Sequence, residues 1–417
     1  MHSDNDDVCG FDFGTSNSSI GHVRDGHAEL IALQDGRVSI PTAIFFSFED
    51  GRAHFGREAV LRYVQRDEGR LMRSLKGVLG SSLIHETTTI KGVRLRFLDV
   101  IAMFLSHVRQ MAGSPTAVVM GRPVHFVDGD DEADNEAEEQ LRTAAEIAGF
   151  KHIEFQFEPI AAALDYEQTV AEEQLAFIVD IGGGTSDFSI VRVSPERRGL
   201  SDRKSDILAT SGVRVGGTDF DKYLDLRTVM PHLGLGSKLL RQNMEPPVWW
   251  FHDLATWQRI NTMYEPRVAT DIRRVRRDAR EPEKFDRLLR VIEARTGHAL
   301  LGAVEDAKIA LSDRDVTTLR IPDLRDIGDT TITRRNLEEA IGSSLERVME
   351  RLRLTLEMAG LRADAIDAVF LTGGSSKLPM LKAQVQAIFP GASIIEGDAF
   401  GSVATGLSID AHNRFCD

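Results

Sequence analysis

The chain has 417 residues, of which 42% are hydrophobic and 27% are charged, and this ordinary globular composition predicts about two to three domains. The formal net charge of −14 argues against a general binder of nucleic acids or anionic membranes, although it is compatible with a local basic pocket. The two cysteines, Cys9 and Cys416, form neither a zinc pattern nor a disulfide framework, so they indicate a reducing compartment.

The first seven residues are acidic and polar, unlike the basic and then apolar opening of a signal peptide. No uninterrupted apolar run approaches the roughly 20 residues that are needed to span a bilayer. We therefore expect a cytoplasmic protein with no membrane partner.

The first predicted elements form a β meander over residues 8–48. Its first strand ends in Asp12, Gly14, Thr15 and Ser16, and a β-prone return follows. A further turn is expected at the Asp-Gly pair between the next two strands.

Residues 56–112 are predicted to be mostly helical, with 71–80 and 97–105 as the clearest segments. Lys76 lies between apolar neighbours in the first of these segments. By itself this position indicates a surface lysine whose aliphatic stem packs on apolar groups.

Residues 117–123 are predicted to form a short buried strand that ends in a proline. The acidic run 128–139 predicts a solvated loop and the acidic first turn of a helix that continues to Ala148. Its carboxylates lack the spacing of a calcium-binding EF-hand loop.

After a strand at 153–157, a helix is expected to begin at Glu158, because Pro159 suits a first turn and alanines follow. Two interpretations of Glu158 stay open at this point. It is either a surface acid that complements the helix dipole or a residue of a functional site.

The stretch 177–190 carries the strongest chemical signal. An apolar strand ends in Asp180, three glycines and Thr185 follow, and Asp187 opens a second strand. Backbone N–H groups of consecutive glycines can cradle phosphate oxygens, and carboxylates can hold a hydrated magnesium ion through its waters. A glycine-rich hairpin without a ligand is the alternative.

This stretch repeats the plan of residues 8–20: strand, Asp-x-Gly, Thr-Ser and a return that ends in Ser-Ile. Two copies far apart in one chain indicate a duplicated domain whose halves clamp one polyanionic ligand. A nucleotide fits that description best.

A strand, a glycine pair and a helix start follow at 213–221, with Thr218 or Asp219 as the expected helix cap. The chain is then predicted to be helical and strongly charged up to residue 312. Its basic cluster 273–277 is surrounded by acids, which favours a solvated helix face over a basic site. The tryptophans favour packing over base stacking.

Glu305, Lys308 and Ser312 are spaced to lie on one face of a helix, where a surface salt bridge is the plain alternative to a site.

A further helix is expected at 333–359. A strand at 368–372 then leads into a Gly-Gly-Ser turn, which lets a planar base or a phosphate approach the backbone.

In this order the motifs resemble the ATPase core of DnaK-type heat-shock chaperones, within the actin, sugar-kinase and chaperone superfamily. The motifs are Asp-x-Gly-Thr, Glu-Pro-x-Ala-Ala-Ala, Asp-x-Gly-Gly-Gly-Thr-x-Asp, Gly-Gly-x-Asp-Phe-Asp, Glu-x-Ala-Lys-x-x-Leu-Ser and Gly-Gly-Ser-x-x-x-Pro. The resemblance runs from about Val8 to the C-terminus, and the bacterial YegD group of chaperone-like proteins is the most similar subgroup.

The resemblance implies an α/β protein with a duplicated ribonuclease-H-like (actin-like ATPase) fold, in which two lobes flank a nucleotide cleft. Lobe I is expected at 1–176, with its core at about 1–39 and 114–176, an inserted subdomain at about 40–113, and the C-terminal residues 393–417 returning to it. Lobe II is expected at 177–392, with its core at about 177–228 and 319–392 and a largely helical inserted subdomain at about 229–318.

The resemblance also implies roles for single residues. Asp12 and Asp180 match the aspartates that hold a hydrated magnesium ion. The catalytic matches are Lys76 at the γ-phosphate, Glu158 and Asp187 around the attacking water, and the Thr185 hydroxyl at the phosphates. The expected contacts to ATP or ADP are Gly14, Thr15, Ser16, Gly182, Gly183, Gly184, Gly217, Gly373 and Lys377, and for the adenosine Glu305, Lys308, Ser312, Gly374, Ser375 and Asp398.

The chain departs from the family at several positions. Where the family sandwiches adenine between two arginines, this chain has Ile309 and Lys377, and neither offers a guanidinium plane for stacking. Pro123 matches the relay proline of the family, but Glu138 stands where its relay arginine is expected. The interdomain linker, β-sandwich and lid of the family have no counterpart in the chain, so we expect an ATPase core without a substrate-binding domain.

We therefore expect a magnesium-dependent, ATP-binding and slowly ATP-hydrolysing chaperone-like protein. Its expected partners are the nucleotide and an unidentified protein partner or client, with no nucleic acid. A bacterial actin-like filament-forming ATPase and a small-molecule kinase of the same superfamily are the alternatives. Asp187 and the Gly-Gly-Thr-Asp-Phe-Asp run favour the chaperone side.

Overall fold

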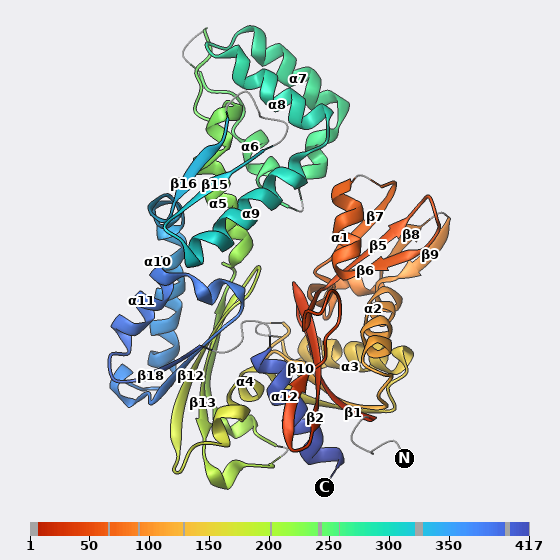
Figure 1. The fold of residues 1–417 in the computed structure, drawn as a ribbon, viewed down its shortest axis with the longest axis vertical. Coiled ribbons are helices and arrows are strands. Elements are labelled where there is room, and N and C mark those ends of the chain that lie inside the picture. Colours follow the sequence, from red (N-terminus) through yellow and green to blue (C-terminus); the bar gives the residue numbers. More distant parts are fainter. Residues whose placement is uncertain are drawn as a thin grey trace. The chain divides into compact units, whose positions relative to one another are not determined.

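The computed structural model describes residues 7–65, 67–90, 92–127, 130–200, 202–240, 244–257, 259–321, 328–396 and 401–416. Asp398, one of the expected adenosine contacts, lies outside these residues. The chain divides into two compact units (Figure 1). Unit 1 comprises Met1–Gly212, Arg351–Ser376 and Val385–Asp417, and unit 2 comprises Val213–Glu350 and Lys377–Gln384.

The first sheet of unit 1 has the strand order β11-β10-β1-β2-β3, with β4 also paired to β2. The bounds are β1 Val8–Phe13, β2 Asn17–Arg24, β3 His27–Leu30, β4 Ser39–Pro41, β10 Ala117–Arg122 and β11 His152–Phe157. Strand β1 runs parallel to β10 and antiparallel to β2. The meander predicted over residues 8–48 is confirmed for β1 to β3, but residues 43–47 pair in a separate sheet. The second turn of the meander has positive φ at Asp25 (51°) and Gly26 (78°), as tight hairpin turns require.

The second sheet of unit 1 repeats this plan with the order β14-β13-β12-β17-β18. The bounds are β12 Gln174–Ile181, β13 Ser186–Val193, β14 Ile207–Val213, β17 Ala368–Thr372 and β18 Ser393–Glu396. Strand β12 runs antiparallel to β13 and parallel to β17, as β1 does with β2 and β10. The repeat seen in the sequence is therefore a repeat of topology.

Helices α4 (Glu158–Glu167) and α12 (Ser402–Phe415) pack against each other in unit 1. Their apolar side chains share one buried cluster with Val119 of β10, Ile178 of β12 and Phe370 of β17. The alanines of α4 leave room for this close approach, because they add little side-chain volume.

Helix α3 (Asp131–Ala148) is the acidic helix that the sequence predicted. The Asp130 side chain caps it by accepting a hydrogen bond of 3.0 Å from the backbone N–H of Ala133. Gly149 ends it in the left-handed conformation with φ 104°. The helix packs against α2 (Phe97–Met111), which confirms the predicted segment 97–105.

The helical prediction for 71–80 is wrong. Residues Gly69–Arg73 form strand β7, and Leu75–Val78 form a short 3₁₀ helix. Strand β7 pairs antiparallel with β5 (Ala43–Ser47), which also pairs with β6 (Ala53–Phe55). Pairing with a distant strand overrides the local periodicity, and Ser74, with φ 56°, separates the strand from the 3₁₀ turn.

The rest of this insertion consists of α1 (Gly56–Gln65) and a hairpin of β8 (Thr87–Ile90) and β9 (Val93–Arg96). Shorter 3₁₀ helices in the chain are Ser82–His85, Pro195–Arg197, Lys204–Asp206, Met230–Leu233, Ile260–Tyr264, Ala363–Ala365 and Gly374–Lys377.

Unit 2 is largely helical, as the sequence predicted. Its helices are α5 Gly217–Thr228, α6 Trp249–Leu254, α7 Pro266–Arg277, α8 Pro282–Glu293 and α9 Gly297–Asp313, and β15 (Val316–Leu319) pairs with β16 (Thr330–Thr333). Helix α10 (Arg334–Met358) begins in unit 2 and ends in unit 1, and α11 (Pro379–Ile388) likewise belongs to both.

Two expectations for unit 2 can be compared directly with its side chains. Arg273 and Arg276 of α7 pair with Glu293 and Asp286 of α8, which confirms a solvated, salt-bridged helix face. Thr218 and Asp219 both lie inside α5, and Gly216 is the capping residue, so the predicted cap is wrong. The carboxylate of Asp219 accepts a hydrogen bond of 3.0 Å from the N–H of Gly216, because the helix begins at Gly217.

Among the described residues, none of the helices is both long enough and apolar enough to cross a bilayer.

The packing of α12 on α4 generates a stability prediction. A Cβ atom added at Gly406 would lie under 3.0 Å from the carbonyl oxygen of Ala161, whereas one added at Gly342 of α10 would meet nothing within 4 Å. Gly406→Ala should therefore lower the free energy of unfolding by about 1–3 kcal/mol through overpacking. Gly342→Ala should raise it by about 0.5–1 kcal/mol, since alanine favours a helix over glycine.

Thermal unfolding of both variants beside the wild type measures the difference. If both variants changed the unfolding temperature equally and in the same direction, the close approach of α4 and α12 would be contradicted, because both variants replace glycine by alanine.

Candidate functional site

The candidate site is centred on carboxylates from both sheets of unit 1. Asp12 lies near the end of β1 and Asp180 near the end of β12, at equivalent places in the two repeats. Glu158 begins α4, and Asp187 on β13 is paired with Asp180 across the hairpin. The local sequence places each of these acids near the end of a helix or a strand, and the fold brings them close together.

Lys76 is the cation that faces these carboxylates. Its side chain is only 10% exposed, and its ammonium forms an ion pair with Glu158. Burial works against the charged ammonium, but the charges of Glu158, Asp12 and Asp180 outweigh it and raise the pKa of Lys76. The interpretation of Lys76 as a surface lysine is therefore wrong. The fold buries its side chain against Glu158, which lies 82 positions away in the sequence.

The two aspartates at the strand ends hold their protons unusually tightly. Desolvation, together with the charge of Glu158, raises the pKa of Asp12 to about 7, although Lys76 acts in the opposite direction. Desolvation and the charges of Asp187, Glu158 and Asp12 raise the pKa of Asp180 to about 8. The site thus has more negative charge than its own lysine neutralises.

Carboxylate oxygens that lack a compensating cation are suitable for a hard divalent ion such as magnesium. In the described part of the chain, no group of three or more His, Cys, Asp or Glu side chains is arranged to hold a metal ion directly. Magnesium often keeps several water molecules as ligands and is then bound through only one or two carboxylates.

The glycine loops of the two repeats lie close to each other. A Cβ atom on Gly183 would collide with the hydroxyl of Ser16, and one on Gly14 would collide with the carbonyl of Asn17. Thr15, Gly184 and Thr185 are exposed, and the Thr185 hydroxyl donates a hydrogen bond of 2.9 Å to Asp187. Two backbone turns with accessible hydroxyls thus face the same place, which is the arrangement that phosphate binding needs.

The third glycine loop reaches the same carboxylates. Gly373 has φ 81°, and a Cβ atom there would lie under 3.0 Å from the carbonyl of Ile181 and from the carboxylate of Asp180. Only glycine permits this approach. Gly374 and Ser375 follow in a short 3₁₀ helix, and Ser375 is buried.

The expected adenosine residues of unit 2 lie on α9. Lys308 is buried, and its ammonium pairs with Asp221 at 2.8 Å and donates to the carbonyl of Gly217 at 3.1 Å. Desolvation raises the pKa of Asp221 to about 6, with Lys308 acting against the rise and Glu305 adding to it. Lys308 is therefore bound to α5, and a lysine has one further N–H donor for another group.

The sequence interpretation missed Asp221 as the partner of Lys308, although the Gly-Gly-Thr-Asp-Phe-Asp run contains it. Ser312 lies on the same helix, and Ile309 is 56% exposed.

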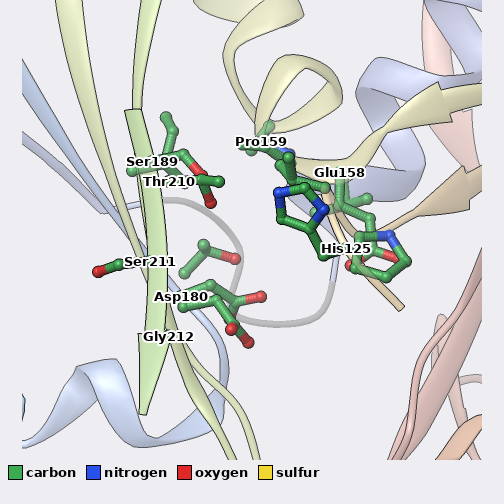
Figure 2. Close-up of a pocket in the computed structure, with 15 residues that line it drawn as sticks. His125, Glu158, Pro159, Asp180, Ser189, Thr210, Ser211 and Gly212 are labelled. Carbon is green, nitrogen blue, oxygen red and sulfur yellow. The ribbon is translucent and has the colours of Figure 1, made fainter. Parts of the chain in front are cut away.

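A cavity of about 110 Å³ adjoins the carboxylates of unit 1 (Figure 2). Glu158, Asp180 and Asp187 form its acidic side, and Ser189, Thr210, Ser211 and Thr372 line it with hydroxyls. His125 also lines this cavity. The sequence interpretation missed His125, because nothing in its local pattern distinguishes it from a loop histidine.

The mixed α/β architecture of unit 1, with two sheets of equivalent order and paired aspartate loops, is that of a nucleotide-binding domain and is consistent with an actin-like fold. The family model described as Hsp70 protein matches residues 8–229 and 284–412. The chain belongs to the Hsp70 family and contains its ATPase core.

Curated relatives at a distant level are chaperone proteins HscA. The protein of Pectobacterium atrosepticum is 27% identical, that of Pectobacterium carotovorum 28%, and that of Citrobacter koseri 26%. Each match covers 97% of this chain and 58% of the relative, so the chain spans little more than half the length of these proteins.

The raised pKa of Asp180 generates a prediction about stability. A carboxyl group with a higher pKa in the folded than in the unfolded state binds more protons when folded, so its contribution to stability falls as the pH rises between its two pKa values. For Asp180 this window runs from about 3.8 to about 8. In metal-free buffer at pH 8, Asp180→Asn should therefore unfold a few degrees above the wild type, since about 1 kcal/mol corresponds to roughly 2–4 °C in a large domain.

The gain should shrink as the pH is lowered towards 4, where the wild-type carboxyl is protonated as well. Thermal unfolding across this pH range measures it. If Asp180→Asn were less stable than the wild type at pH 8, the inferred excess of negative charge at the site would be contradicted.

Proposed function

We propose that the protein binds Mg-ATP and Mg-ADP and slowly hydrolyses ATP, as a chaperone-like ATPase core related to the YegD group. The observation that carries this proposal is the pair of only partly compensated carboxylates, Asp12 and Asp180, together with the glycine loops that contain Gly14, Gly183 and Gly373 beside them. A cation that is bound together with a polyanion suits such a site. The cation neutralises the carboxylates, and the polyanion neutralises the charge that remains on the cation.

In this proposal Asp12 and Asp180 hold magnesium through its waters. The phosphates are cradled by the backbone N–H groups and hydroxyls of Gly14, Thr15, Ser16, Gly182, Gly183, Gly184, Thr185 and Gly373. For the remainder of the nucleotide we propose the residues that match the family: Gly217, Glu305, Lys308, Ser312, Gly374, Ser375, Lys377 and Asp398. We also propose the lobe and subdomain boundaries that the resemblance implies.

Hydrolysis needs a water molecule in line with the γ-phosphorus and positive charge at the transferred oxygens. Glu158 and Asp187 flank the water in the proposal, and Lys76 supplies the charge. The magnesium ion, when bound, would contribute further charge neutralisation at the phosphates. The ion pair of Lys76 with Glu158 supports these roles, because it holds the cation and one water-positioning acid together.

We further propose a cytoplasmic location and an unidentified protein client or partner. The word chaperone in the names of the HscA relatives supports a protein client. No nucleic-acid partner is proposed, because the net charge of −14 opposes one.

Titration calorimetry tests the binding half of this proposal. We expect the wild type to bind ATP and ADP more tightly with magnesium than without it. Asp180→Asn should weaken binding about tenfold or more in magnesium but little in a chelator, because the variant loses a partner of the hydrated ion. A protein that binds neither nucleotide at millimolar concentration would disprove the site.

Single-turnover hydrolysis tests the role of Lys76. Lys76→Met keeps most of the aliphatic stem and removes the charge, so ATP affinity should stay within about tenfold while the rate of hydrolysis falls roughly a hundredfold. The charge stabilises developing charge in the transition state more than it stabilises bound ATP. A matched control is Lys151→Met, at an exposed lysine of unit 1 outside the site. Equal rates in all three proteins would remove Lys76 from the chemistry.

A further inference from the structure

His125 is the one imidazole among the described residues that line the cavity next to the carboxylates. It follows β10 in the segment Pro123–Val124–His125, and Figure 2 shows its ring in the cavity near Glu158. The residue is exposed. Within the described part of the chain, no hydrogen bond or ion pair of its ring occupies either nitrogen, so the ring is available to a water molecule.

The acids that flank the proposed water are already engaged. Glu158 is ion-paired with Lys76, and Asp187 accepts a hydrogen bond from the Thr185 hydroxyl. Each of these contacts uses lone pairs of the carboxylate and fixes its orientation. These acids are therefore suited to position a water molecule, and a separate group in the cavity can accept the proton that the water loses.

We propose that His125 is that acceptor, and thus a further catalytic residue, on the basis of the ATPase activity proposed above. In the step, the water oxygen forms a bond to the γ-phosphorus, and the bond from phosphorus to the bridging oxygen breaks with its electron pair left on ADP. One water proton passes to the free nitrogen of the neutral imidazole, and the other stays on the phosphate. The exposed ring then releases its proton to solvent.

The cavity provides a path for this proton. Its volume of about 110 Å³ is several times the roughly 10–15 Å³ that one water molecule needs. Hydroxyls line one side, with Ser189 and Thr210 hydrogen-bonded to each other at 3.1 Å. Water molecules held there can relay a proton even when the imidazole does not touch the attacking water.

The experiment is chemical rescue in single-turnover hydrolysis. His125→Ala should lower the rate about ten- to a hundredfold, within the range of acid–base catalysis. Added imidazole should restore part of this loss, and the restored rate should rise with the neutral fraction of the added imidazole.

The matched control is His27→Ala, at an exposed histidine of β3, which should keep the wild-type rate and gain nothing from imidazole. Calorimetry with ATP separates this inference from the function on which it rests. If His125→Ala binds ATP and hydrolyses it at the wild-type rate, or if imidazole has no effect on a slowed variant, His125 is not the acceptor and the proposed function stands. If the wild type binds ATP without hydrolysing it, both fall.

Discussion

The structure depends on one electrostatic constraint, the concentration of carboxylates where β1, β12 and α4 meet. Burial and mutual repulsion raise the pKa of Asp12 and Asp180, and the Lys76 ammonium offsets only part of the charge. Such a cluster costs folding free energy without a ligand. It is therefore maintained against its cost by the packing around it, and a cation, alone or together with a polyanion, would reduce that cost.

Helix α4 is one of the elements that provide this packing. It begins with Glu158 in the site and ends with Glu167, which is fully buried and accepts hydrogen bonds of 2.7 and 2.9 Å from the guanidinium of Arg203. Arg203 is itself buried and also pairs with Asp206. Between its ends the helix is pressed against α12 at Gly406. Because both ends and one face are fixed, the carboxylate of Glu158 has little freedom to move away from the acids that repel it.

The sequence was sufficient for what depends on neighbours along the chain. The aspartate hairpins, the glycine loops and the start of α4 follow from local strand, turn and capping patterns, and the repeat between residues 8–20 and 177–190 predicted sheets of equivalent order. The sequence was insufficient where contacts between residues far apart along the chain determine the structure. Residues 71–73 belong to a segment that was predicted to be helical but pair with β5. The partner of Lys308 lies on another helix, and only the cavity beside His125 distinguishes this histidine.

The departure at Glu138 illustrates the same dependence on partners. An acid in place of an expected arginine suggests a broken connection, yet Arg122 of β10 pairs with Glu138 and, at 2.6 Å, with Asp134 of the same helix. The Arg122 guanidinium also lies 5.1 Å from the ring centre of Phe157, the residue before Glu158, and Asp134 accepts a hydrogen bond from the N–H of Phe126, the residue after His125. In this chain the positive charge lies on β10 and its acidic partners lie on α3. Both flanks of the cavity are thus tied to one buried ion pair, so the position of His125 relative to Glu158 is set by β10 and α3 and not by the loop alone.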